Sequence, residues 1–198
     1  MTSKKIDQGN LIPVIIFDSI QDKFLEPGDA GVSTYITGIA AGETHIGEIG
    51  ASTAVIPLTL SLEAAAYDLN DVLSATQELA NAVRVAGGSG ILQSIQVIDQ
   101  DDQGQAIDIF IFNADATLGV ENAAISISDA DAAKIIGIVR VVANDYVDCI
   151  NSMNASMNGL NIPVEAAAGT SLYVATATRG TPTHTAAGIV LNLGILQD

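Results

Sequence analysis

The stretch GTSLYVATATRGTPTHTAAGIVLNLGILQD, residues 169–198, holds two strand-like patterns on either side of a turn. In residues 172–177, Leu172, Val174 and Thr176 share one face of an extended chain, and the residues between them share the other. Residues 189–195 repeat this period of two, with isoleucine or leucine at every second position. The segment RGTPT (179–183) supplies turn chemistry, since glycine admits positive φ and proline fixes φ near a turn value. These patterns predict a hairpin that closes the sheet of a β-rich domain.

Similar segments recur at short spacing from residue 55 onward, which is typical of an all-β domain. Residues 76–85 also fit a strand, although Ala, Leu, Glu and Gln favour a helix. One short helix is expected over residues 129–136, where an aspartate can cap the first turn and Gly137 can end it. We therefore predict an all-β fold, a β-sandwich or jelly roll, with one short helix. The expected strands are 55–62, 67–72, 91–98, 107–112, 139–142, 164–168, 172–178 and 189–196.

The first 53 residues differ in character from the rest. Two apolar segments, 11–17 and 32–39, are separated by EPGD and followed by the glycine-rich AAGETHIGEIGAST. They look like strands that pair with another part of the protein or with a neighbouring subunit, because two strands bury too little surface to form a core. We expect an N-terminal arm or small β module over residues 1–53 and a β-sandwich domain over residues 54–198.

Composition and charge exclude several classes of protein. With 48% hydrophobic residues, 15% charged residues and a mean hydropathy of +0.39, most of the chain should be folded. The net charge of −16 argues against nucleic acid, because binding a phosphate backbone needs clustered lysine and arginine. No apolar run approaches the roughly 18 to 20 residues of a membrane-spanning helix, and residues 11–17 make a poor export signal. We expect no nucleic-acid or membrane partner.

A single cysteine, Cys149, permits no intramolecular disulfide and fits assembly in a reducing cytoplasm. Its apolar neighbours Val147 and Ile150 predict that it is buried. A catalytic thiol would need a histidine partner, and neither His45 nor His184 lies in a recognisable Cys/His signature. We therefore expect a structural role for Cys149.

The segment DQDDQG (99–104) is where oxygen ligands crowd together. Asp99, Asp101 and Gln103 alternate before a glycine as in an EF-hand loop, yet Phe110 occupies the position of the closing glutamate. We prefer an exposed hairpin turn to a calcium site.

Other candidate motifs are weaker. GGSG (87–90) resembles a phosphate-binding loop but lacks the following Lys-Ser or Lys-Thr. An acid pair of Asp145 with Asp148, or a metal held by His45 and His184 together with carboxylates, remains a minor alternative, because isolated polar loop residues are usually solvated. Zinc-ligand spacings and serine nucleophile elbows are absent. The sequence therefore predicts no catalytic, cofactor or metal site, and no enzyme.

From about residue 55 to 198 the chain resembles a family of tailed-phage virion proteins that decorate or cement the capsid. This resemblance implies a jelly-roll β-sandwich, a structural role on the virion, contact with the major capsid protein and threefold assembly, after synthesis in the host cytoplasm. It supplies no catalytic residues, and residues 1–53 lie outside it. The matching segments are NAVR (81–84), GGSG (87–90), LQSI (92–95), residues 103–112, DAD (129–131), IIG (135–137), LY (172–173), RGTPT (179–183) and LGILQD (193–198).

Two functions from different classes follow. The first is a capsid-stabilising protein that bridges neighbouring major capsid subunits, with its N-terminal arm on the shell. The second is a carbohydrate-binding or host-recognition module, which is weaker because sugar sites usually stack aromatic rings and the chain has no tryptophan and 4% aromatic residues. A cupin-like enzyme ranks third, since two widely separated histidines are too few for the metal chemistry of that fold.

Overall fold

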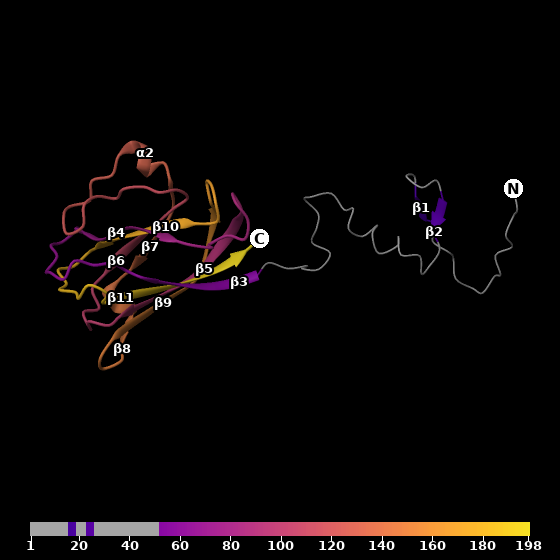
Figure 1. Ribbon diagram of the computed structural model, residues 1–198. Coiled ribbons are helices and arrows are strands. Elements are labelled where there is room, and N and C mark those ends of the chain that lie inside the picture. Colours follow the sequence, from indigo (N-terminus) through magenta and orange to yellow (C-terminus); the bar gives the residue numbers. More distant parts are fainter. Residues whose placement is uncertain (1–15, 19–22, 26–51) are drawn as a thin grey trace, which may run out of the picture. The chain divides into compact units, whose positions relative to one another are not determined.

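The structure is a computed structural model that describes residues 16–18, 23–25 and 52–198 (Figure 1). The chain divides into two compact units, with the boundary between residues 49 and 50. In the first unit, β1 (Ile16–Asp18) pairs antiparallel with β2 (Lys23–Leu25). The expected strand at 11–17 overlaps β1 at its last two residues. The rest of it, the expected strand at 32–39 and His45 all lie outside the described residues.

The second unit is a sandwich of two antiparallel sheets, which confirms the predicted all-β class (Figure 1). Two short helical turns, α2 (Asp129–Ala132) and the 3-10 turn η2 (Ala143–Asp145), are the helical elements in the described part of the chain. One sheet has the order β4 (Val72–Leu79), β10 (Leu172–Thr178), β6 (Ile107–Phe112), β7 (Ile135–Val141). The other has the order β3 (Ser52–Thr59), β11 (Ile189–Gln197), β5 (Ser89–Asp99), β9 (Met153–Glu165), β8 (Tyr146–Asp148).

The strand order is that of a jelly roll. The first strand of the sandwich, β3, pairs with the last, β11, and in the other sheet the second strand, β4, pairs with the next-to-last, β10. The chain passes between the sheets at nearly every connection, as two interlocked Greek keys require. The three-residue β8 extends the five-stranded sheet beyond this pattern.

The predicted hairpin of β10 with β11 is wrong, because the two strands lie in different sheets. The predicted side-chain faces are nevertheless confirmed: Leu172 and Val174 enter the core between the sheets, while Ala175 and Ala177 are buried on the opposite face of β10. A period of two identifies the buried face of a strand but not its partner strand. The turn residues 179–183 therefore begin a connection that crosses the sandwich.

Several expected boundaries also differ. Residues 67–71 precede the strand, which runs from Val72 to Leu79 and stops before Asn81, where φ is +57°. The helix is four residues long, and its cap is the Ser128 hydroxyl, which accepts a hydrogen bond from the Asp131 N–H. Gly137 lies inside β7 and does not end the helix. β8 and residues 153–163 of β9 were not expected as strands, and the strand expected at 164–168 overlaps β9 at two residues.

The main core fills the space between the sheets, and a second apolar cluster covers the outer side of the four-stranded sheet. In that second cluster Ala116 and Leu118, from the loop after β6, pack against Phe110 and Phe112 of β6. None of the helices in the described ranges is both long and apolar enough to cross a membrane.

Cys149 is exposed, so its predicted burial is wrong. It lies in the turn between β8 and β9 beside Val147 and Ile150, whose side chains are 65% and 84% exposed. Apolar neighbours in sequence predicted a core position, but this turn projects beyond the edge of the core and Ile150 adopts a φ of +77°.

Candidate functional site

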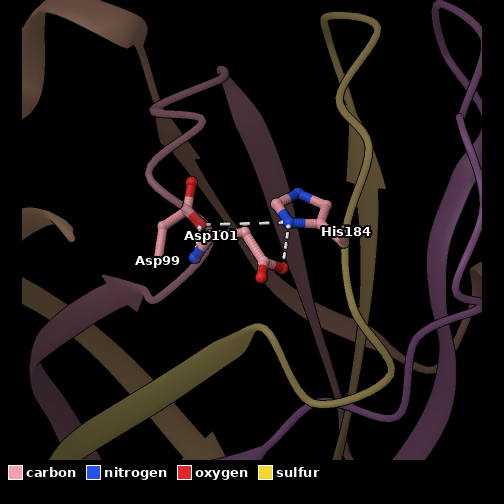
Figure 2. Close-up of side chains that lie close together, drawn as sticks. All are labelled: Asp99, Asp101 and His184. Atoms are coloured by element: carbon pink, nitrogen blue, oxygen red, sulfur yellow. Dashed lines mark hydrogen bonds and ion pairs between the residues drawn. The ribbon is translucent and has the colours of Figure 1, made fainter. Parts of the chain in front are cut away.

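Three titratable side chains from two segments that are distant in sequence meet where the chain crosses between the sheets (Figure 2). Asp99 ends β5, Asp101 follows in the next loop, and His184 comes from the connection between β10 and β11. One potential ligand atom from each residue lies within 4.8 Å of the others. The jelly-roll topology therefore brings together two segments that the sequence alone did not connect.

Asp99 organises the loop that follows it. Its Oδ1 accepts a hydrogen bond from the Asp101 N–H at 3.0 Å, and its Oδ2 accepts from the N–H groups of Gln103 at 3.0 Å and Gly104 at 2.8 Å. The Asp99 residue is 2% exposed. The predicted exposed hairpin is therefore wrong: β5 and β6 belong to different sheets, and the buried Asp99 carboxylate binds backbone donors of its own turn.

Asp101 links this loop to the β10–β11 connection. Its carboxylate accepts hydrogen bonds from the Thr185 N–H at 2.7 Å and the Thr185 hydroxyl at 2.9 Å, and its Oδ2 lies 3.2 Å from His184 Nδ1. A Cβ at Gly188 would collide with the same carboxylate, so a side chain there is excluded. We call Asp101, His184 and Thr185 the Asp101 clasp.

His184 is 4% exposed, so the expectation of a solvated loop histidine is wrong. Its ring meets the Tyr67 ring edge-on, with 6.4 Å between the centroids, and its Nδ1 lies 3.9 Å from Asp99 Oδ1. Burial by itself would raise the pKa of the Asp101 carboxyl, but hydrogen bonds from Thr185 and His184 hold that pKa below its ordinary value. The clasp therefore favours an ionised Asp101.

The geometry of the clasp favours a structural role. Aspartate and histidine are metal ligands, but both Asp99 oxygens and the Asp101 carboxylate already accept hydrogen bonds from donors of the chain. A metal ion would have to compete with these bonds. The prediction that the chain has no catalytic, cofactor or metal site stays a prediction.

A second group of charges lies on the four-stranded sheet. Asp108 of β6 is 1% exposed and binds Arg140 Nε at 3.0 Å, Arg179 Nε at 2.8 Å and Arg179 Nη2 at 2.7 Å. Burial would raise the Asp108 pKa, but the hydrogen bonds and charges of the two arginines hold it below its ordinary value. Arg179 Nη1 also donates to Asn70 Oδ1 at 2.6 Å. We call Asp108, Arg140 and Arg179 the Asp108 ion cluster.

An aspartate within an otherwise apolar strand indicates such a cluster in the sequence. Asp108 stands in the strand IDIFIF, where every residue is buried. A carboxylate in such a strand must be paired, because an unpaired buried charge is strongly unfavourable. The pattern did not identify its partners, because Arg140 of β7 and Arg179, which directly follows β10, lie 32 and 71 residues away.

The remaining sequence candidates make local contacts. Asp145 Oδ2 accepts a hydrogen bond from the Val142 N–H at 2.9 Å, and Asp148 Oδ1 accepts from the Ile150 N–H at 2.7 Å. These bonds shape two separate turns. GGSG (87–90) forms the turn into β5, with Gly87 at a φ of +68°.

The outer side of the five-stranded sheet is different in chemistry from the rest of the surface. Ile95, Val97, Ala155, Leu191 and Leu193 point into the core, so the residues that alternate with them point outward. Among these outward residues the charged side chain is Glu165, at the end of β9. We call this outward side the open face. At its centre lies a depression of about 310 Å³, lined by Val55, Ser94, Ile95, Gln96, Ser156, Asn158, Asn192 and Gly194.

Comparisons with known proteins give no family for this chain. No protein-family description matches it, and no curated protein does. A solved structure from desmodium yellow mottle tymovirus aligns with a TM-score of 0.26 and 11% identity, over 98% of this chain and 94% of that one. VP2 of infectious bursal disease virus, in a subviral particle, aligns with a TM-score of 0.27 and 15% identity, over 74% of this chain and 32% of that one. Scores this low carry no argument about function.

Proposed function

We propose that the protein is a non-enzymatic structural protein of a virion, which decorates the capsid and stabilises it by bridging neighbouring major capsid subunits. The sequence resemblance to tailed-phage decoration proteins supports this proposal. The jelly-roll strand order is compatible with it, since viral capsid domains share this architecture with lectins and cupins. Because one fold hosts several functions, the choice among these classes has to come from the side chains.

The cupin alternative fits the side chains poorly. Cupin-like metal chemistry uses several histidines, whereas His184 is the one histidine in the part of the chain that the structure describes. Its Nδ1 faces Asp101, whose carboxylate is also bound by Thr185. The His184 imidazole therefore helps to hold the β10–β11 connection against the β5–β6 loop.

The carbohydrate alternative has one observation in its favour. The depression on the open face is lined by hydroxyl and amide side chains, which can hydrogen-bond a neutral sugar. However, no aromatic ring lines it to stack on a pyranose, and aromatic side chains are the usual anchors of ligand sites. We therefore rank glycan binding second.

The observation that carries the proposal is the use of charged groups to fasten the sandwich together. The Asp101 clasp joins the β5–β6 loop to the β10–β11 connection, and the Asp108 ion cluster joins β6, β7 and the first residue after β10. In both, the titratable groups contact other parts of the chain and not an open cleft. Such a body suits a protein whose task is to hold a fixed shape on a shell.

The arm of residues 1–53 is the part that we propose contacts the shell. Lys4, Lys5 and Lys23 place three of the seven basic residues of the chain in this arm. They can attract acidic patches on the capsid, while strands of the arm add to an exposed sheet edge of the major capsid protein. The resemblance also implies that the protein works as a homotrimer.

Co-sedimentation with purified capsids that lack the protein tests this function. The full chain should pellet with the capsids at a saturating ratio, and excess salt should weaken the contact partly, because its apolar part is not screened. A glycan-binding screen of the same preparation serves as the comparison. Failure to bind capsids together with specific binding of a neutral glycan would overturn the proposal in favour of the second function.

A further inference from the structure

The two outer sides of the sandwich differ in whether a loop covers them. The outer side of the four-stranded sheet is covered by the loop after β6, where Leu118 and Ala116 are buried against the sheet. The open face of the five-stranded sheet has no such cover among residues 52–198. Val55 on β3 and Val147 on β8 are 67% and 65% exposed at its two edges, and Ile91 on β5 is 37% exposed.

The charge of the protein makes this open face unusual. The net charge is −16, so two copies of the chain repel each other wherever acidic surfaces meet. Across the five strands of the open face, Glu165 at one end is the charged outward residue. Depletion of charge at the centre of a surface is the compositional mark of protein–protein interfaces. Like-charge repulsion is therefore weakest between copies when they meet through this face.

The polar side chains of the open face also suit a second copy. Asn192 donates to Gln96 across the β11–β5 pair at 3.1 Å, and Ser94, Ser156 and Asn158 surround them. Amide and hydroxyl groups both donate and accept hydrogen bonds, so the same set of groups can pair with a copy of itself. A basic partner would gain nothing from a neutral face and would prefer the acidic surface elsewhere.

Other exposed apolar side chains do not form a comparable surface. Ile150 lies in the β8–β9 turn near Val147, and Ile138 lies on β7 at the edge of the four-stranded sheet. The others lie outside the strands: Leu69, Val85, Val120 and Val142. Single exposed apolar residues are normal on a folded protein. In the described part of the chain, the open face is a broad sheet surface whose one charged outward strand residue, Glu165, lies at its end.

We propose that the open face of the five-stranded sheet is the surface through which copies of this protein associate. The face is independent of the capsid role, since it is assigned from the charge and side chains of the body alone. The depression beside Gly194 receives side chains of the neighbouring copy, and its amide groups pair across the contact. The number of copies follows from the measured mass.

The test adds one negative charge to the open face of the full chain. Ser156→Glu changes an exposed β9 residue opposite Gln96, and Asn158→Asp adds a charge with almost no change of shape. Ala130→Glu adds the same charge on exposed α2, away from the five-stranded sheet, and is the matched control. Thermal unfolding of each variant checks that it is folded.

Sedimentation velocity over a range of concentrations is the measurement. We expect the wild type and Ala130→Glu to associate equally, and both face variants to associate at least about tenfold more weakly, because like charges facing each other across a contact are unfavourable. Added salt should restore part of the association. A monomeric wild type, or face variants that associate as the wild type does, would overturn the proposal. A monomer that still decorates capsids would leave the proposed function standing while this assignment falls.

Discussion

Replacing Asp108 with asparagine removes the charge that both arginines of the Asp108 ion cluster share. Asp108 is 1% exposed and accepts hydrogen bonds from Arg179 at 2.8 Å and Arg140 at 3.0 Å. A hydrogen bond to a charged group contributes about 1.5 to 3 kcal/mol, and breaking a fully buried pair costs about 3 to 5 kcal/mol. Because the Arg179 side chain is 30% exposed and keeps some water, we expect a loss of about 2 to 3 kcal/mol.

Urea and thermal unfolding measure this loss. A domain of this size loses roughly 2 to 4 °C in Tm per kcal/mol, so Asp108→Asn should melt about 4 to 12 °C below the wild type. Arg140→Ala is the control, because the Arg140 side chain is 69% exposed and its contact is largely screened by water, so its Tm should change little. An Asp108→Asn variant within about 0.5 kcal/mol of the wild type would refute the reasoning.

The same variant has a pH signature. The pKa of Asp108 is held below its ordinary value in the folded state, so the ionised carboxylate stabilises the fold above the unfolded pKa of about 3.9. This contribution is lost as the pH falls through the lower, folded pKa. The stability difference between the wild type and Asp108→Asn should therefore be constant from neutral pH to about pH 5 and shrink below about pH 4.

Three further predictions concern other parts of the molecule. EDTA should leave the Tm unchanged, because donors of the chain occupy the carboxylates of the 99–104 loop; a fall in Tm reversed by Ca²⁺ would show a metal site there. Burial and the hydrogen bond to Glu121 raise the pKa of Tyr67, so stability should fall as the pH rises above about 10, and less steeply in Tyr67→Phe; equal slopes in urea titrations would contradict this. Deleting residues 1–49 leaves β3 whole, so cooperative unfolding should survive while capsid co-sedimentation decreases; full retention of binding would show that the arm is not the anchor.

Individual strands with regular side-chain alternation could be predicted from the sequence. β6 and β10 have the predicted bounds because both strands are rich in apolar and β-branched residues and are buried along their length, except for the partly buried Tyr173. The inward residues of β11 are those that the period of two selected. The first half of β9, MNASMNG, was missed although its residues alternate, because its apolar positions hold Met and Ala and not the β-branched or aromatic residues typical of strands. One face of it belongs to the open face, where burial does not select apolar residues.

Contacts between distant segments could not be predicted, because they depend on which sheet each strand joins. The error on β10 and β11 shows this: the turn residues between them fit a hairpin, yet the connection passes from one sheet to the other. The burial of His184 follows from that crossing, as does its contact with Asp101. The local sequence does not indicate such a crossing, because packing of the whole sandwich decides which sheet each strand joins.

Heating capsids with and without the protein tests the central claim most directly. Capsids that lack the protein are mixed with a saturating amount of the full chain, and the temperature at which the packaged DNA becomes accessible to a dye is recorded. A protein that bridges neighbouring major capsid subunits binds the intact shell and not the separated subunits, so it should raise this temperature in proportion to occupancy. Saturated binding with no rise in the temperature of DNA release would contradict the account.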